Sequence, residues 1–370
     1  MSAPLRRWRH DLHRIPELGL REHRTGDYLA AELAALGLDV VRGVGGTGLV
    51  ATLRGRGPGR AIGLRADMDG LPLHERGDRP YRSEHDGVMH ACGHDGHMAM
   101  LLGAAHVLAT EGGFDGTVHL IFQPAEEHGL GARAMIADGL FERFPVEAIY
   151  GVHNMPGQPA GSFGTRPGPL MAGEDNFEIR IAGRGGHAAR PQMVVDPIVI
   201  AAELVLALQT IVARSIDPAS PAVVSCTEIT TDGARNAIPG EAVIRGDTRS
   251  FDVQVSALIE RRMRELAAGI SAAHGASASV SYTRSFEPTV NTAREAAAAL
   301  CAARAVTDQV DGEVAPWTAS EDFGVFLRAV PGCFALLGTG DGPSLHSPEY
   351  DFNDDVLDLG VRYYVNLVRA

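Results

Sequence analysis

The sequence predicts an α/β protein: a mostly parallel sheet flanked by helices, into which a ferredoxin-like α+β module is inserted. Two observations support this prediction. Helix and strand patterns alternate up to residue 171 and again after residue 287. Between residues 172 and 287 the order changes to strand, helix, two strands, helix and strand. We therefore expect a larger domain in two parts, 1–171 and 288–370, and a second domain at 172–287.

The larger domain alternates regularly. RTGDYLAAELAALGL has helical spacing, TGLVATLRG and RAIGLRADMD are predicted strands, and GHMAMLLGAAHVLAT is a long apolar helix. Strand TVHLIFQP, helix LGARAMIADGL and strand EAIYGVHN follow. After the inserted module come a helix, SEDFGVFL, the apolar strand CFALLG and the helix VLDLGVRYYVNLVRA. This alternation predicts parallel strands covered by helices on both faces.

The inserted module has six predicted elements. Strand NFEIRIAGR and helix DPIVIAAELVLALQTIVAR are followed by strands PAVVSCTEIT and EAVIRGDTRS, a second long helix and strand SASVSYTRSF. This is the order of a split βαβ unit. The run PIVIAAELVLALQTIVA is apolar on more sides than one covering helix needs, so we expect a homodimer through this module.

Composition excludes several classes. The 33 basic residues are scattered against 46 acidic ones, and the net charge of −13 makes nucleic acid an unexpected partner. The N-terminus lacks the apolar segment of a signal peptide and no run of 18 apolar residues occurs, so we expect a cytoplasmic protein without a membrane span. Four dispersed cysteines are too few for a disulfide framework.

Side chains that bind metals follow several apolar runs. Ligands gather at the carboxyl ends of strands in open α/β sheets, so residues distant in sequence can converge there. A pair of divalent cations needs about six to eight donor atoms, and mixed sulfur, nitrogen and oxygen donors suit zinc, manganese, nickel or cobalt. The sequence therefore predicts a two-metal hydrolase site. The candidates are Cys92, His94, Glu126, Glu127, His153 and His346.

Adjacent glutamates suggest a division of roles. Consecutive side chains point apart in an extended segment, so Glu126 is expected not to reach the metals that Glu127 binds. Glu126 is then free to take a proton from a metal-activated water. Asp69 lies two residues beyond Asp67 and is suited to accept the second N–H of a ligand imidazole, or it is simply a loop carboxylate.

The motifs RADMDGLPL, MHACGHDGHMAMLLGAA, FQPAEE, GVHN, GRGGHAARP, ARNAIPG, SEDF and LHSPEYDFND occur in this order. With them, nearly the whole chain resembles the aminoacylase, hippurate hydrolase and auxin-conjugate hydrolase family of two-metal amidohydrolases. The resemblance implies a zinc-exopeptidase-like fold with a small lid domain that dimerises. It also implies that Glu126 is the general base. The implied metal ligands are Cys92, His94, Glu127, His153 and His346.

Three residues of the inserted module are further candidates. The resemblance implies that His187 stabilises the oxyanion in the neighbouring subunit's active site, the alternative being a solvated loop histidine. Asn236 and Arg249 are weaker candidates for holding the substrate's acyl oxygen or carboxylate. Packing and surface roles are expected for other histidines, namely His10, His13, His23, His97, His106 and His119.

One departure affects substrate preference. Before SEDF, which begins at Ser320, the family usually has a Met-Gly pair, whereas this chain has Trp317, Thr318 and Ala319. We expect a reshaped substrate pocket. The predicted function is metal-dependent cleavage of an N-acyl amino acid, such as an N-acetyl or N-benzoyl amino acid. A dipeptidase or carboxypeptidase, and a non-catalytic metal-dependent binding protein, are the alternatives.

Overall fold

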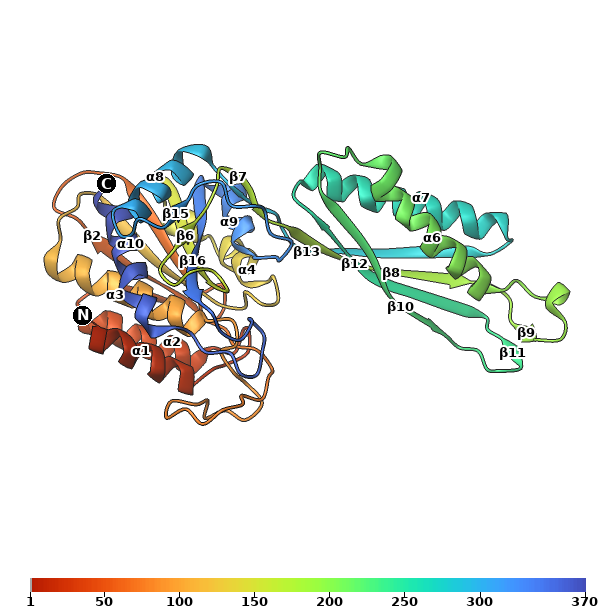
Figure 1. Cartoon of the computed structure of the whole chain (residues 1–370), viewed down its shortest axis with the longest axis horizontal. Helices are drawn as coiled ribbons and strands as arrows, with labels where there is room; N and C mark the ends of the chain where they lie inside the picture. Colours follow the sequence, from red (N-terminus) through yellow and green to blue (C-terminus); the bar gives the residue numbers. More distant parts are fainter. Residues whose placement is uncertain (1) are drawn as a thin grey trace. The chain divides into compact units, whose positions relative to one another are not determined.

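The computed structural model describes residues 2–370 (Figure 1). The chain divides into two compact units. Unit 1 comprises Met1–Leu170, Thr289–Pro316 and Glu321–Ala370, and unit 2 comprises Met171–Pro288 and Trp317–Ser320. The unit boundaries at 170/171 and 288/289 each lie one residue from those expected.

Unit 1 contains an eight-stranded mixed sheet in the order β1-β2-β4-β3-β5-β16-β6-β15. Its central strands β4, β3, β5 and β16 run parallel, whereas β1 and β2 are antiparallel at one edge. β7 (Gly168–Met171) and β14 (Thr289–Asn291) form a separate two-stranded sheet. The strands of the large sheet are β1 (Asp39–Val44), β2 (Gly48–Arg54), β3 (Ala61–Asp67), β4 (Thr117–Gln123), β5 (Ala148–Pro156), β6 (Phe163–Gly164), β15 (Val310–Asp311) and β16 (Gly332–Gly340).

Helices pack in two groups against this sheet (Figure 1). Alternate residues Ile62, Leu64 and Ala66 of β3 join the main apolar core with α1, α3 and α10. Arg65, which lies between them, instead meets the start of α9. The first group is α1 (Ser2–Arg14), α2 (His23–Ala35), α3 (His94–Glu111), α8 (Ala293–Arg304) and α10 (Leu357–Arg369), which follows the 3-10 turn η2 (Asp354–Val356); the second is α4 (Gly131–Ala137), α5 (Leu140–Arg143) and α9 (Phe323–Ala329).

Unit 2 is a four-stranded antiparallel sheet in the order β10-β12-β8-β13, with α6 and α7 on one face. The chain order is that of a split βαβ unit. Buried residues alternate with partly or fully exposed ones along β8, so one sheet face packs on the helices. The elements are β8 (Gly173–Ala182), β9 (Gly186–His187), η1 (Pro191–Met193), α6 (Pro197–Ser215), β10 (Ala222–Thr231), β11 (Ala237–Ile238), β12 (Glu241–Ser250), α7 (Val253–Ala273) and β13 (Ser277–Phe286).

The segment Trp317–Ser320 corrects the expected domain limits. We expected all of 288–370 in the larger domain, but this segment packs within unit 2. The backbone N–H of Ala172 donates to the carbonyls of Trp317 (2.9 Å) and Ala319 (3.1 Å). Arg249 Nη1 donates to Ser320 Oγ at 2.7 Å. Hydrogen bonding, and not chain order, therefore assigns these four residues to unit 2.

Helix α6 is long and apolar enough to span a membrane by the criteria of length and composition. This is weak evidence, because Leu204 and Leu208 are buried in the core of unit 2. Leu206, in contrast, has 73% of its surface exposed, and Val199 on the same helix has 54%. The helix thus has a buried face and an exposed apolar face.

Candidate metal centre

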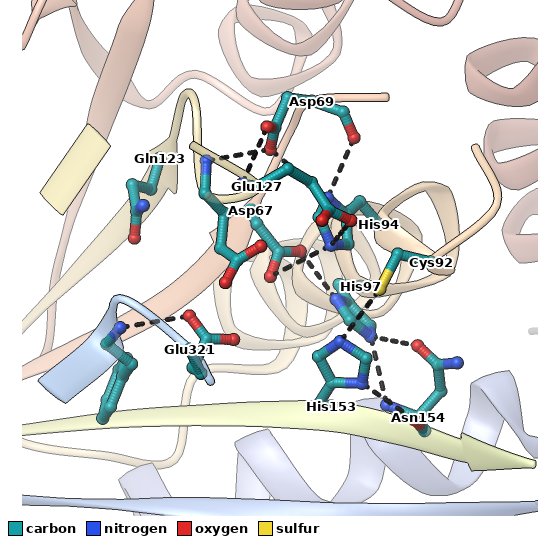
Figure 2. A network of polar contacts seen from close by, with 12 residues as sticks. Asp67, Asp69, Cys92, His94, His97, Gln123, Glu127, His153, Asn154 and Glu321 are labelled. Atoms are coloured by element: carbon teal, nitrogen blue, oxygen red, sulfur yellow. Dashed lines mark hydrogen bonds and ion pairs between the residues drawn. The ribbon is translucent and has the colours of Figure 1, made fainter. Parts of the chain in front are cut away.

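The five predicted metal ligands converge in unit 1. Figure 2 shows four of them, Cys92, His94, Glu127 and His153. The five ligands come from the end of β5, the turn after β4, the start of α3 and the loop before η2. Their donor atoms form two groups, in each of which all donors lie within 4.8 Å of one another. Cys92 belongs to both groups. The groups are Cys92, His94 and His153, and Cys92, Glu127 and His346.

Donor atoms of the candidate ligands point at one another, and two of them have no hydrogen-bonding partner. His94 Nε2 and Glu127 Oε1 are buried and accept no hydrogen bond, and they lie 3.9 Å apart. His346 Nε2 is 3.4 Å from the same Glu127 oxygen, and Cys92 Sγ forms a 3.5 Å hydrogen bond with His153 Nε2. Because a buried polar atom without a partner is costly, His94 Nε2 and Glu127 Oε1 fit the coordination of a divalent cation.

The orientation of two imidazoles is set by backbone carbonyls. His94 Nδ1 donates to the carbonyl of Asp69 at 2.9 Å, and His153 Nδ1 donates to the carbonyl of Asn154 at 2.8 Å. Because Nδ1 carries a proton in each ring, Nε2 is the nitrogen that faces the cluster and can bind a metal once it is deprotonated. This is the tautomer that a metal-binding histidine needs.

Three unusual backbone conformations place these donors. Gly93 has φ +92°, and a Cβ atom there would lie 2.4 Å from Asn154 Oδ1, so the CGH motif requires its glycine. Ala125 and His346 have φ of +48° and +60°, a region that non-glycine residues seldom occupy. Such strain persists where the surrounding contacts impose it, and it often marks a functional site.

The expectation that Glu126 and Glu127 point apart is wrong. The segment after β4 is a turn closed by a 2.7 Å bond from Gly129 N–H to the carbonyl of Glu126, not an extended strand. Both carboxylates consequently come within 4.8 Å of a His94 nitrogen. Any separation of their roles must come from their neighbours and not from strand alternation.

Asp69 differs in detail from the prediction. It lies beyond the end of β3, and its backbone carbonyl is what accepts the His94 Nδ1 proton. Its carboxylate Oδ1 is 3.4 Å from the same nitrogen. The two carboxylate oxygens also accept the backbone N–H groups of Glu126 and Glu127, each at 3.1 Å. Asp69 therefore joins the turn that carries both glutamates to the start of α3.

Glu126 lies among carboxylates. One oxygen each of Glu126, Glu321 and Asp322 lies within 4.8 Å of the others. Burial, followed by the charges of Glu321, Glu127 and Asp322, raises the pKa of Glu126 well above its usual range. The carboxyl group therefore holds a proton much more readily than a surface glutamate.

The thiol of Cys92 is also affected by its surroundings. Burial, with the nearby charges of Glu127, Glu126 and Asp67, raises its pKa well above the ordinary value. Burial opposes protonation of His94, but Asp67 and Asp69 outweigh it and raise the pKa of His94 to about 10. Thiolate formation in this negatively charged cluster thus requires added positive charge, which divalent cations would supply.

The sequence matches peptidase family M20/M25/M40 over residues 63–370. The chain belongs to this family. It is 39% identical to a hippurate hydrolase of Campylobacter jejuni over 97% of this chain and 94% of the relative. A thermostable carboxypeptidase of Saccharolobus solfataricus is 38% identical, with coverage of 95% and 91%. The resemblance found in the sequence motifs is thereby confirmed.

A related solved structure has the same fold. A Bacillus subtilis protein described as a dinuclear metal-binding peptidase of the M20 family superposes with a TM-score of 0.88. The two chains are 33% identical, and the match covers 100% of this chain and 97% of the other. The M20 chain described here accordingly has the mixed α/β fold of a hydrolase family that acts on amide bonds.

The structure brings two of the unit 2 candidates together. His187 in β9 pairs with Ala237 in β11, and the N–H of Ala188 donates to the carbonyl of Asn236 at 3.1 Å. His187 and Asn236 are both exposed. Arg249 differs, because its guanidinium contacts Glu174 and Asp247, each at 2.8 Å, in addition to Ser320.

Sequence reasoning missed a buried hydrogen-bonded chain behind the M20 site (Figure 2). His97, assigned to packing, contacts Asp67 Oδ1 through Nδ1 and the Asn154 side chain through Nε2, both at 2.6 Å. Arg65 donates to Asp67 Oδ2 at 2.8 Å and to Glu321 Oε1 at 2.8 Å. The available signals were the i, i+3 spacing of His97 from His94 and the charged Arg65 within an apolar strand.

Proposed function

We propose that this chain is a metal-dependent amidohydrolase that cleaves an N-acyl amino acid to a carboxylic acid and a free amino acid. The observation that carries the proposal is the pair of donor groups that share Cys92, with the buried carboxylate of Glu126 beside them. The relative named hippurate hydrolase supports a substrate with an acyl group on the nitrogen of an amino acid.

The two donor groups would hold one divalent cation each. Cys92, His94 and His153 would hold the first, and Cys92, Glu127 and His346 would hold the second. When bound, two cations polarise the amide carbonyl and lower the pKa of a bound water toward about 7. Zinc, manganese, nickel and cobalt all suit these donors.

Glu126 is the proposed general base. Its raised pKa favours retention of a proton taken from water until that proton is delivered to the leaving nitrogen. Glu127 has the burial and orientation of a ligand, since its Oε1 faces two imidazoles. Asp69 would fix the position of the His94 imidazole relative to the backbone of both glutamates.

Unit 2 is proposed to act as a lid and dimerisation domain. His187 would stabilise the oxyanion in the partner's site, and Asn236 would hold the acyl oxygen; the β9–β11 pairing that holds them side by side supports this. Arg249 would bind a substrate carboxylate only if that carboxylate replaced Glu174 or Asp247 as the partner of the guanidinium. The exposed face of α6 would contact a second copy of the chain. Leu206 and Val199 lie on this face and do not pack into the core of unit 2.

A carboxypeptidase or dipeptidase is the second candidate. The Saccharolobus relative named a thermostable carboxypeptidase favours it, since cleavage of a peptide next to its C-terminal residue is the same amide chemistry. Glu126 argues against a non-catalytic binding protein, which needs no base beside its ligands. We also propose that the enzyme acts in the cytoplasm on small molecules, without nucleic acid or membrane partners.

The test is a hydrolysis screen with N-acetyl, N-benzoyl and indole-acetyl amino acids and with dipeptides, in buffers matched for each metal. We expect hydrolysis of an N-acyl amino acid that a chelator abolishes and divalent metal restores. Elemental analysis of each preparation is the control. Full activity in a preparation shown to be free of metal would exclude the proposed mechanism, and activity on dipeptides alone would select the second candidate.

A further inference from the structure

The loop that carries His346 lacks regular structure. Residues 341–353 form neither helix nor strand, so individual contacts must place the imidazole. One contact is with the segment just before Cys92: the N–H of His346 donates to the carbonyl of Ala91 at 2.9 Å. The left-handed conformation of His346 is itself unfavourable for a residue with a Cβ atom. Something else in the fold must therefore hold this loop.

Arg9 of helix α1 is one of the residues that hold it; Arg79 also contacts the loop, at the carbonyl of Glu349 (2.6 Å) and at Asp351 Oδ2 (3.2 Å). Its side chain is fully buried, and Nη1 lies 2.9 Å from Asp351 Oδ1 in the loop. Nε lies 2.6 Å from Asp354 Oδ1, and the guanidinium carbon is 4.5 Å from the centre of the Tyr81 ring. Tyr81 also donates from its hydroxyl to Asp351 Oδ2 at 2.7 Å. Both oxygens of Asp351 are thus occupied by groups outside its loop.

The same guanidinium contacts the other side of the metal centre. Arg9 Nη1 is 3.2 Å from Asp95 Oδ2, and Asp95 directly follows His94 in the first turn of α3. Asp95 is fully buried and also contacts His13 Nδ1 at 2.8 Å. One nitrogen of Arg9 therefore bridges a carboxylate next to His94 and a carboxylate five residues after His346.

We propose that Arg9 is a positioning residue for the metal centre, which sets the loop of His346 against the start of α3 through Asp351 and Asp95. The inference rests on the proposed function, because it assumes that His94 and His346 belong to different cation sites that share Cys92. Outer contacts that orient ligands commonly change metal affinity by about 10- to 100-fold when removed.

General stabilisation is the rival explanation. The network as a whole adds little net stability, because removing a guanidinium and its carboxylates from water costs about as much as their attraction returns. Removing Arg9 alone would nevertheless destabilise the fold, because it leaves buried carboxylates without a counter-charge, so a loss of stability by itself does not distinguish the two explanations. What such a network does provide is a fixed geometry. Here the geometry joins two ligand segments that are about 250 residues apart in sequence.

Metal binding distinguishes the two explanations. We would measure the metal content and affinity of Arg9→Met, by elemental analysis and by competition with a chelator, using zinc as the probe. We expect the wild type to hold two ions per subunit. Arg9→Met should bind the ion of the His346 group about 10- to 100-fold more weakly and retain the ion of the His153 group. Activity is a separate readout.

Two further variants keep the test valid if Arg9→Met folds poorly. Asp351→Ala removes only the loop side of the bridge, and its side chain is 28% exposed, so the fold should tolerate the change. Asp351→Ala should also weaken binding of the ion of the His346 group alone. The double variant with Arg9→Met should bind that ion no more weakly than the single variant with the larger loss. Leu12→Ala on the same helix, a buried core position, is the control: it should lose stability but keep both ions.

The outcomes separate the two proposals. A wild type without bound metal would overturn the proposed function, and this inference with it. A wild type with two ions, together with unchanged affinity in Arg9→Met and Asp351→Ala, would overturn the inference alone. Equal metal loss in Leu12→Ala would also overturn it, because destabilisation of α1 would then suffice.

Discussion

The two units hold their candidate residues in opposite ways. In unit 1 His94 and Glu126 are buried and already contact fixed neighbours. In unit 2 His187 and Asn236 are exposed, and they are held by the two-residue pairing of β9 with β11 and by short-range hydrogen bonds such as that from Ala189 N–H to His187 Nδ1. The difference teaches that the candidate metal ligands are preorganised within unit 1, whereas the candidate residues of unit 2 lie on its surface with few fixed neighbours.

Arginines show the same contrast. Arg65 in unit 1 is fully buried between Asp67, Glu321 and Asp322. Arg245 in unit 2 contacts Glu178 and Glu228 at distances that are just as short, 2.7 and 2.8 Å, but on the open face of the sheet. Contacts of similar length therefore differ in electrostatic strength between the two units. Water screens the network of Arg245 and is excluded from that of Arg65.

The largest expected effect concerns the two glutamates of unit 1. Glu126→Gln should lower kcat by about 10²- to 10⁴-fold, the range for a general base, yet retain both metal ions. Glu127→Gln should instead lose metal, because it removes a ligand oxygen. Steady-state kinetics and elemental analysis of the same preparations check both statements. Equal metal loss in the two variants would show that their roles are misassigned.

The second prediction sets Arg65 against Arg245. Arg65→Met should lower the free energy of unfolding by about 3 to 5 kcal/mol, because it leaves buried carboxylates without a counter-charge. The matched control, Arg245→Met, should unfold at the same denaturant concentration as the wild type. Both proteins are measured after chelation, so that bound metal does not contribute. Similar midpoints for the two variants would remove the contrast between the units.

A third prediction asks whether unit 2 completes a site in trans. His187→Ala should lower kcat by about 10²- to 10³-fold, as loss of an oxyanion donor does. After subunit exchange, a mixture of His187→Ala and Glu126→Gln should regain activity, because one site of the mixed dimer holds both wild-type groups. Unmixed variants are the control. A monomer in sedimentation, or no recovery after demonstrated exchange, would contradict the trans role.

The smallest effect concerns pH and a buried histidine of unit 1. Burial would lower the pKa of His13, but Asp95 and the hydrogen bonds to Asp95 and Glu75 raise it to about 9. Because the folded pKa exceeds the ordinary 6.5, the stabilisation is complete below pH 6.5 and is lost as pH rises through about 9. It should amount to roughly 3 kcal/mol.

Guanidinium unfolding of the metal-free protein between pH 6 and pH 9.5 checks this prediction. The wild type should lose stability across the range, and His13→Asn should lose much less, since it carries no titrating ring. The same pH dependence in both proteins would assign the effect to another group.

Much of the fold could be predicted from the sequence. Strands such as TVHLIF and CFALLG are nearly all apolar, and a run that is apolar on both sides specifies a buried strand without further information. The change of element order after residue 171 likewise indicated a second unit. The exception was Trp317–Ser320, which belongs to unit 2 through backbone hydrogen bonds that have no pattern in the sequence.

For the site, the sequence by itself determined which donor chemistry is available: one thiol, three imidazoles and a pair of carboxylates near the ends of apolar runs. The tertiary structure decided their geometry and their charge. Only a turn could bring Glu126 and Glu127 to the same side, and only folding could bury Arg65, His97 and Arg9 among carboxylates. The reason is physical: local patterns specify which face of an element is buried, whereas burial of a charge depends on partners distant in sequence.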